Sequence, residues 1–222
     1  MNYPDVVVFP GWATDYRIFE NLHLEANLIF PPDPFEEGIE ERLATYFVKN
    51  KIGKATILGW SLGGFISARF AKSYPGLVKN LVLCGMRPEY PHELIEETRR
   101  KLLADRDGFL KNFYRQCFLP AQKSDYNEFH KYLLSQYLAE MDNSQLSASL
   151  ELLGKLKLEY ENPGPFPSFL IHGFRDVVAP VQEMENFILK AQWVTLKVLI
   201  NSSHAVFLNP EFSKTVNGIL NE

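Results

Sequence analysis

The stretch Ala55–Ala68 reads ATILGWSLGGFISA and decides how the rest of the chain is interpreted. Its short apolar run, residues 56–58, is typical of a buried strand, and the residues after 64 have the apolar spacing of a helix. Between them, Gly59, Ser61 and Gly63 form the pattern Gly-x-Ser-x-Gly. The sequence therefore predicts a strand, a tight turn and a helix, with Ser61 at the apex of the turn.

The chemistry of a nucleophilic serine explains this spacing. A serine that attacks a carbonyl carbon must stand clear of the backbone, so the turn around it is sharp and strained. Glycines two residues before and after the serine remove side chains that would collide there. The helix that follows points its N-terminus at the reacting oxygen, where its dipole favours negative charge. The alternative is a glycine-rich turn in which Ser61 only caps a helix, but the flanking strand and helix favour the nucleophile.

Length and composition limit the possible functions. The 222 residues suffice for one sizeable core, and a net charge of −4 gives no indication of nucleic-acid binding. No apolar run is long enough to span a membrane, and no signal peptide is visible. Cys84 and Cys117 belong to no disulfide or metal motif, which favours a reducing compartment. We therefore expect a cytoplasmic protein with no metal or cofactor and no nucleic-acid or membrane partner.

Predicted strands and helices alternate along the chain. Besides the strand at 56–58, strands are expected at residues 5–9, 27–30, 78–84, 168–172 and 194–200. Helices are expected after the serine turn and at residues 36–50, 181–191 and 211–220. Between residues 86 and 160 only helices are expected, near 91–106, 108–118, 124–140 and 144–156. This alternation predicts a mostly parallel sheet with helices on both faces, formed by residues 1–85 and 161–222, and an all-helical lid insertion at 86–160.

A serine nucleophile needs a base, and five histidines are available. His204 lies in a loop after the last predicted strand, the end of the sheet where catalytic groups gather. His172 ends a predicted strand but precedes a glycine, which indicates a structural turn role. His23, His92 and His130 lie in or beside predicted helices, where a solvated or capping histidine is usual. We therefore predict His204 as the base.

The acid that orients the base is predicted to be Asp176. Where a Gly-x-Ser-x-Gly serine has a triad, the acid usually stands between the serine and the histidine in the chain. Asp176 does so, shortly after the strand at 168–172, in the stretch His-Gly-Phe-Arg-Asp. Glu89 remains an alternative, because it follows the strand at 78–84. The aspartates of the predicted insertion are better explained as solvated charges.

Two backbone N–H groups are needed to bind the oxyanion. One is expected from Leu62, the residue after the nucleophile, and the other from the loop after the first strand. That loop is Pro10-Gly11-Trp12. Proline cannot donate, so Trp12 or a neighbour is the expected second donor. The alternative is that Trp12 is only a core residue.

Three stretches together resemble the α/β-hydrolase superfamily over nearly the whole chain. The closer similarity is to the biotin-pathway esterases that cleave the methyl ester of pimeloyl-acyl carrier protein. These stretches are Gly11-Trp12, Gly59–Gly64, and Ser203–Phe207 with the downstream residues Pro210 and Phe212. The resemblance implies the α/β-hydrolase fold. It also implies the following roles: nucleophile Ser61, base His204, acid Asp176, and oxyanion donors Trp12 and Leu62.

The chain departs from the family pattern at three places. Pro10 stands where the family usually has a histidine that braces the loop. Pro-Pro-Asp-Pro around Asp33 replaces the usual Asp-x-Pro-Gly-x-Gly loop. The chain also starts at what would be the third strand, so the leading β-hairpin is expected to be absent. These departures indicate a divergent and shortened member.

The predicted insertion carries a local excess of positive charge. From Arg99 to Arg115 it has six basic and two acidic residues. In the resembling esterases, lid arginines hold the acidic carrier protein. The resemblance therefore implies partner binding by Arg99, Arg100, Arg106, Lys111 and Arg115. A solvated basic helix face explains the charges equally well. Phe113 and the aromatic residues around it would line an acyl channel, or simply pack in the insertion.

These observations predict a serine-dependent carboxylic ester hydrolase that works through an acyl-enzyme. The resemblance implies pimeloyl-acyl carrier protein methyl ester, in biotin synthesis, as its substrate and acyl carrier protein as its partner. A thioesterase or a cofactor-free C–C hydrolase would use the same triad. A catalytically inactive binding protein with a hydrolase fold is the alternative from another class, and the three filled triad positions argue against it.

Overall fold

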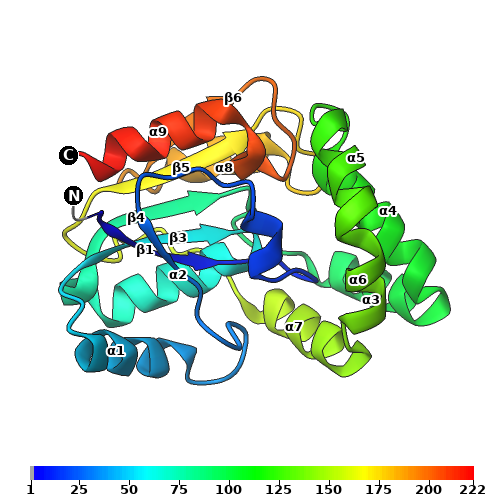
Figure 1. Cartoon of the computed structure of the whole chain (residues 1–222), viewed down its shortest axis with the longest axis horizontal. Helices are drawn as coiled ribbons and strands as arrows, with labels where there is room; N and C mark the ends of the chain where they lie inside the picture. Colours follow the sequence, from blue (N-terminus) through cyan, green and yellow to red (C-terminus); the bar gives the residue numbers. More distant parts are fainter. Residues whose placement is uncertain (1–2) are drawn as a thin grey trace.

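A six-stranded sheet forms the centre of the computed structural model, which describes residues 3–222 (Figure 1). Every pair of neighbouring strands is parallel, and the order is β2-β1-β3-β4-β5-β6. The strands are β1 (Asp5–Phe9), β2 (Asn27–Ile29), β3 (Ala55–Trp60), β4 (Val78–Cys84), β5 (Ser168–Gly173) and β6 (Thr195–Leu199). All six strands predicted from the sequence are confirmed, with bounds that differ by a few residues.

Helices cover both sides of this sheet, with α9 on one side and α1 and α2 on the other (Figure 1). The core helices are α1 (Ile39–Asn50), α2 (Leu62–Ser73), α8 (Val181–Ile188) and α9 (Pro210–Leu220), with 3-10 helices η1 (Tyr16–Phe19), η2 (Pro75–Leu77) and η3 (Val206–Leu208). α1 buries Ile39, Leu43 and Phe47, which recur every four residues and so share one face. The predicted α/β arrangement is therefore confirmed, and amphipathic spacing explains how its helices attach.

The insertion between β4 and β5 consists of α3 (His92–Ala104), α4 (Arg106–Phe118), α5 (Lys123–Tyr132), α6 (Leu134–Glu140) and α7 (Asn143–Lys155). Asp105 caps α4 by accepting from the Gly108 N–H, and Asp142 caps α7 by accepting from the Ser144 and Gln145 N–H groups. At the base of the insertion, Glu89 and Lys157 form an isolated antiparallel bridge.

One helix of the insertion differs from the prediction. The sequence predicts a single helix over 124–140, whereas the structure divides this segment at Leu133, whose φ is −114°. Phe129 and Tyr137, on either side of the break, both pack against Tyr114 with ring centroids 5.1 and 5.7 Å away. Tertiary packing of aromatic rings, which helical periodicity does not encode, accompanies the break.

The sheet has a topological switch point at the carboxyl ends of β1 and β3. The chain leaves β1 toward β2 on one side of the sheet and later enters β3 on the other side of β1. In open α/β sheets, ligands bind at such a switch point, outside the carboxyl ends of the strands. In Figure 1 the strand arrows point toward the helical insertion. The loops after β1 and β3, which contain Trp12 and Ser61, therefore meet beneath the insertion.

Candidate functional site

Ser61 stands at the turn between β3 and α2 with φ 55° and ψ −120°. A non-glycine residue with this geometry costs roughly 1–3 kcal/mol, so its surroundings must enforce it. The Ser61 N–H donates to the Cys84 carbonyl at 2.9 Å. A Cβ on Gly59 would come within 2.3 Å of the Gly63 oxygen, and one on Gly63 within 2.4 Å of the Phe9 oxygen. Both glycines of the motif are therefore required by close backbone contacts.

The loop after β1 lies directly against Ser61. A Cβ on Gly11 would come within 3.2 Å of the Ser61 Cβ and 2.9 Å of the Trp60 ring. Leu62 is the first residue of α2, a position whose N–H has no acceptor within its own helix. The structure thus brings the two segments that contain the predicted oxyanion donors, Trp12 and Leu62, to the same side chain.

The helical insertion braces the loop after β1, where Pro10 stands at the position at which the resemblance implies a histidine. The Tyr114 hydroxyl donates to the Ala13 carbonyl at 2.6 Å, and the Trp12 indole N–H donates to the Leu146 carbonyl at 3.0 Å. Within the loop, the Thr14 hydroxyl donates to the Gly11 carbonyl at 2.9 Å. These three hydrogen bonds support the loop without a histidine.

Trp12 is at the same time a packed residue. Its side chain is buried, and its ring meets Phe113 edge-on, with ring centroids 5.1 Å apart. Phe109 also packs against Trp12, whereas Tyr114 and Phe118 are fully enclosed among other aromatic rings. The expected core role of Trp12 and its expected role as an oxyanion donor are therefore compatible, because packing uses the ring and the oxyanion would use the backbone.

His204 and Asp176 form a buried pair. The His204 Nδ1 lies 2.8 Å from the Asp176 Oδ2, and both side chains are almost completely inaccessible to solvent. The other carboxylate oxygen, Oδ1, accepts from the Val178 and Ala179 N–H groups at 2.9 and 2.8 Å. Burial raises the pKa of Asp176, but the charge on His204 and hydrogen bonds from His172 and His204 lower the pKa by a larger amount. The pKa of Asp176 therefore lies below its ordinary value. Asp176 is therefore held as an anion facing His204.

The loop of His204 is also tied to the serine turn. The Trp60 indole N–H donates to the His204 carbonyl at 2.8 Å, and the two rings lie 5.3 Å apart. Gly85, with φ 53°, permits this approach, because a Cβ there would lie 2.7 Å from the His204 oxygen. The His204 Nε2 is buried and has no hydrogen-bond partner among residues 3–222. One ring nitrogen of His204 is thus held by Asp176 and the other is left for a further group.

Among the remaining candidates from the sequence, His172 lies beside Asp176 and the others are exposed. Glu89 is exposed, and it is Asp176 that meets His204. His23, His92 and His130 are exposed. His172, expected to have only a turn role, is buried with its Nε2 2.7 Å from the Ala179 carbonyl and 3.4 Å from the Asp176 Oδ2.

Sequence reasoning missed Tyr90. Its hydroxyl interacts with the Ser61 side chain, and burial raises its pKa above the ordinary value despite this interaction. Its ring packs against Phe65 and beneath the Arg87 guanidinium. No local pattern marks Tyr90, because Ser61 and Phe65 belong to the β3–α2 segment, which is distant from Tyr90 in the sequence.

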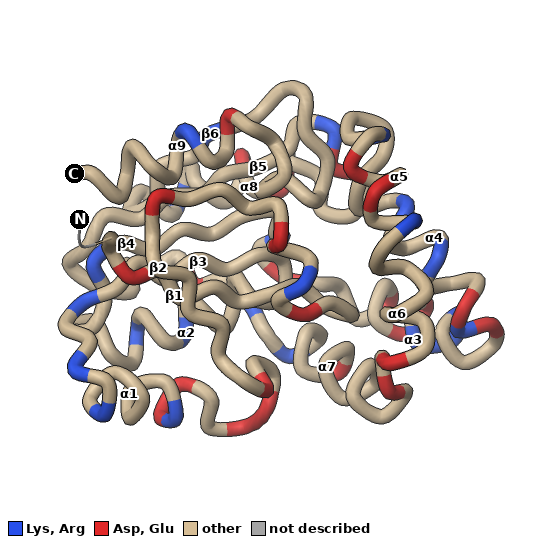
Figure 2. The backbone as a smooth tube through the Cα atoms, viewed as in Figure 1, with Lys and Arg blue, Asp and Glu red and all other residues tan. Residues whose placement is uncertain are grey.

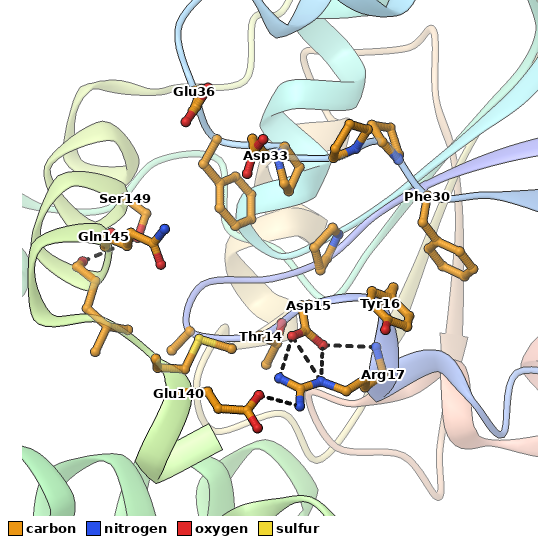
Figure 3. Close-up of a pocket in the computed structure, with 18 of the residues that line it drawn as sticks. Thr14, Asp15, Tyr16, Arg17, Phe30, Asp33, Glu36, Glu140, Gln145 and Ser149 are labelled. Atoms are coloured by element: carbon orange, nitrogen blue, oxygen red, sulfur yellow. Dashed lines mark hydrogen bonds and ion pairs between the residues drawn. The ribbon is translucent and has the colours of Figure 1, made fainter. Parts of the chain in front are cut away.

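A cavity of about 830 Å³ lies beside the loop after β1 (Figure 3). Its walls come from residues 10–17, the proline-rich segment 30–36 and the insertion residues 140–149. Arg17 lies at one side, with its guanidinium between Asp15 and Glu140, each 2.7 Å away (Figure 3). Ser61, His204 and Trp12 are not among its lining residues. The same loop therefore approaches Ser61 at Gly11 and lines the cavity with Pro10 and Ala13.

The predicted partner-binding cations differ in their environments. Figure 2 shows basic residues along α4, where Lys111 and Arg115 are exposed; Arg100 of α3 is exposed as well. Arg99 pairs with Glu96 at 3.2 Å. Arg106 donates to the Leu138 and Met141 carbonyls and contacts Asp107. The guanidinium of Arg106 therefore holds the insertion together, and Arg100, Lys111 and Arg115 are the cations left at the surface.

Comparison with known proteins agrees with this fold. Residues 48–148 match the model of a family described as alpha/beta hydrolase fold. Pimeloyl-acyl-carrier-protein methyl ester esterases of Wigglesworthia glossinidia brevipalpis and Nitrosospira multiformis are 27% and 25% identical to the chain. The matches cover 94% and 93% of this chain and 89% of each relative.

Solved structures show the same fold over the whole chain. An esterase from Exiguobacterium antarcticum superposes with a TM-score of 0.81, and an enol-lactonase from Burkholderia xenovorans with 0.78. Each is 18% identical, and each match covers 100% of this chain and 93% of the other. Within residues 3–222, no helix combines the length and the apolar character needed to cross a bilayer. The relatives and structural neighbours are named as esterases and other hydrolases, which is consistent with a carboxylesterase. The chain therefore has the α/β-hydrolase fold and resembles the pimeloyl-acyl-carrier-protein methyl ester esterases.

Proposed function

We propose that this chain is a serine-dependent carboxylic ester hydrolase that works through an acyl-enzyme. The Ser61 hydroxyl attacks the ester carbonyl while the His204 Nε2 takes its proton, and His204 then returns the proton to the departing alcohol. Water, activated by the same nitrogen, hydrolyses the acyl-serine. Asp176 holds the imidazole in the tautomer with hydrogen on Nδ1 and stabilises the imidazolium as it forms.

The oxyanion of each tetrahedral intermediate is assigned to the backbone N–H groups of Leu62 and Trp12. Leu62 opens α2, so its N–H and the positive end of the helix dipole both favour negative charge. Gly11 brings the Trp12 segment against Ser61. Both donors belong to backbone held by glycine contacts and by the insertion, so little reorganisation is needed during the reaction.

The observation that carries this proposal is the buried Asp176–His204 pair in a loop tied to the strained Ser61 turn. Its test is active-site titration with a fluorophosphonate, followed by peptide mass mapping. We expect one label on Ser61, and for Ser61→Ala a fall in ester hydrolysis on the order of 10⁴ or more with normal folding. An unlabelled wild-type protein, or a Ser61→Ala variant that keeps most of its activity, would contradict the proposal. Labelling also separates the enzyme from an inactive binding protein.

For the substrate, we infer an ester bound to an acidic acyl carrier protein, with pimeloyl methyl ester as the first candidate. The support is that the relatives matching more than nine-tenths of this chain are pimeloyl-acyl-carrier-protein methyl ester esterases, together with the exposed cations Arg100, Lys111 and Arg115. A panel of p-nitrophenyl esters, the matching acyl thioesters and pimeloyl-acyl carrier protein methyl ester tests this choice. Higher kcat/KM for the thioesters would instead favour a thioesterase.

A further inference from the structure

A buried glutamine of the insertion lies between the residues on either side of His204. The Gln122 Oε1 accepts from the Ser203 N–H at 3.0 Å, and its Nε2 donates to the Ala205 carbonyl at 2.9 Å. Only 6% of Gln122 is exposed. One side-chain amide thus fixes the backbone immediately before and immediately after the predicted base.

The orientation of this amide is determined by its partners. A backbone N–H can only donate and a carbonyl can only accept, so the oxygen must face Ser203 and the nitrogen must face Ala205. Additional contacts to the Ser202 hydroxyl and to the Asp125 carboxylate are longer, at 3.5 and 3.4 Å. Only a side chain of this length with both a donor and an acceptor can make the two short bonds together.

The same segment of the insertion reinforces this attachment. The Ala205 N–H donates to the Cys117 carbonyl at 2.8 Å, and the Ala121 N–H donates to the Ser203 hydroxyl at 3.1 Å. On the other side, Trp60 binds the His204 carbonyl. The His204 loop is therefore fixed between the serine turn and residues 117–122 of the insertion.

We propose that Gln122 is a positioning residue for His204. This inference rests on the proposed function, in which His204 is the base. Gln122 sets the backbone so that the Nδ1 of His204 meets Asp176 while its Nε2, which has no partner in the described part of the chain, remains free for the Ser61 hydroxyl. Misplacement of a catalytic group by about 1 Å costs on the order of 10²-fold in rate, so a clamp on both neighbours of His204 acts on catalysis and not only on stability.

The first test replaces Gln122 with methionine, which has a similar length but no amide. With p-nitrophenyl butyrate and the full chain, we expect kcat to fall about 10- to 100-fold while KM stays within about twofold, since the substrate does not touch Gln122. We also expect the acid limb of the kcat/KM profile to move to lower pH, because Asp176 stabilises the imidazolium of a displaced His204 less. Gln116→Met, the same change at an exposed position of α4, should leave both quantities unchanged.

A second variant keeps the test independent of how well the methionine variant folds. In Gln122→Glu, the ionised carboxylate accepts from Ser203 but repels the Ala205 carbonyl, whereas the protonated carboxyl restores a donor. Its activity relative to wild type should therefore rise as the pH falls. A pH-independent ratio would contradict the clamp.

A spectroscopic measurement separates this inference from the proposed function. A hydrogen bond from the His204 Nδ1 to Asp176 should give a far-downfield proton resonance that is absent in His204→Gln, whether or not the protein hydrolyses esters. We expect this resonance to shift or broaden in Gln122→Met and to persist in Gln116→Met. If it is unchanged in Gln122→Met, or if that variant keeps the wild-type kcat and pH profile, Gln122 has no positioning role. Absence of Ser61 labelling would instead overturn the proposed function.

Discussion

Ser61 has a backbone conformation that is unfavourable for its own side chain, and its surroundings compensate. A strain of roughly 1–3 kcal/mol persists only when neighbouring contacts over-determine it. Here the Cys84 carbonyl binds the Ser61 N–H, and Gly59 and Gly63 admit the close backbone contacts of the turn. The strained residue stands at the junction of β3 and α2, where the proposed function requires the nucleophile.

Asp176 is expected to act on turnover more than on substrate binding. In Asp176→Asn, the amide cannot stabilise the imidazolium and favours the wrong tautomer of His204, so kcat should fall on the order of 10⁴ with little change in KM. Steady-state kinetics on p-nitrophenyl esters measure both. Glu89→Gln is the matched control, since Glu89 is exposed. If Glu89→Gln abolishes turnover and Asp176→Asn is mild, the acid has been assigned wrongly.

At the scale of single residues, local pattern predicts some roles and not others. Ser61 is predictable because its turn requires glycine at fixed offsets. Asp176 and Glu89 both follow strands, and only the hydrogen bond to His204 separates them. Gln122 and Tyr90 have no local signature, because their contacts depend on how the insertion and the β4–α3 segment fold back onto the core.

The helices of the insertion are part of the site as well as a cover over it. α4 supplies Tyr114 to the loop after β1 and the Cys117 carbonyl to the loop of His204. α7 supplies the Leu146 carbonyl to Trp12. Two loops from opposite ends of the core sequence therefore depend on one insertion for their geometry. This arrangement explains how the loop after β1 is held although Pro10 replaces a histidine.

The exposed cations of α4 are expected to act only on a carrier-bound substrate. Lys111 and Arg115 are one turn apart and so share a face. Lys111→Glu with Arg115→Glu should lower kcat/KM for pimeloyl-acyl carrier protein methyl ester by about tenfold, because rim charges steer association. Added salt should weaken the wild-type enzyme on this substrate, since exposed charges are screened within about 10 Å at 0.1 M.

Two comparisons control this experiment. Lys49→Glu with Lys51→Glu makes the same charge change at the C-terminal end of α1, away from the insertion (Figure 1), and it should have a much smaller effect. Small p-nitrophenyl esters should react equally with all variants, because they meet only the site around Ser61. If kcat/KM falls equally on both kinds of substrate, or equally in both double variants, the basic surface of α4 does not bind the carrier protein and is only solvated.

At the scale of elements, strands were easier to predict than the helices of the insertion. Each strand is an apolar run between breakers, such as β1 before Pro10, and buried parallel strands need little else. The segment 124–140 has helical periodicity throughout, yet it divides at Leu133, where Phe129 and Tyr137 both reach Tyr114. Periodicity predicts which residues are helical, but it does not encode a break that accompanies packing between distant rings.

For the whole molecule, the site is closed. Ser61 is 5% exposed and His204 is fully buried, and neither residue lines the cavity of about 830 Å³ beside the loop after β1. We therefore expect the insertion or that loop to move when an ester binds at Ser61. Because both are joined by hydrogen bonds from Tyr114 and Trp12, we expect them to move together.

The stability of the whole molecule should depend on Asp176 in acid. Burial alone would raise the pKa of Asp176, but His204 and His172 outweigh this effect and lower the pKa in the folded state. The contribution of Asp176 to stability is therefore present above the unfolded pKa of about 4. It is lost as the pH falls through the lower pKa of the folded state. The difference in unfolding free energy between wild type and Asp176→Asn should therefore shrink from pH 5 to pH 3. Urea unfolding at several pH values measures it.

Asp125 provides a control of opposite sign for this experiment. Burial raises the pKa of Asp125, and the hydrogen bond with Gln122 offsets this rise only in part. Ionisation of Asp125 therefore destabilises the folded state as the pH rises. Asp125→Asn should therefore gain stability relative to wild type between pH 3 and pH 6. A constant difference for Asp176→Asn across the acid range would contradict a carboxylate stabilised by the two histidines.

The most direct test of the account is to trap the acyl-enzyme. Wild-type protein is mixed with p-nitrophenyl butyrate, quenched in acid within milliseconds and digested. The mass of the peptide that contains Ser61 is then measured by mass spectrometry. For the wild-type protein, we predict one butyryl group on Ser61, formed together with a burst of p-nitrophenol. The same adduct should form more slowly in Asp176→Asn and should be absent in Ser61→Ala. Turnover without an adduct on Ser61, or an adduct on another residue, would show that Ser61 is not the nucleophile.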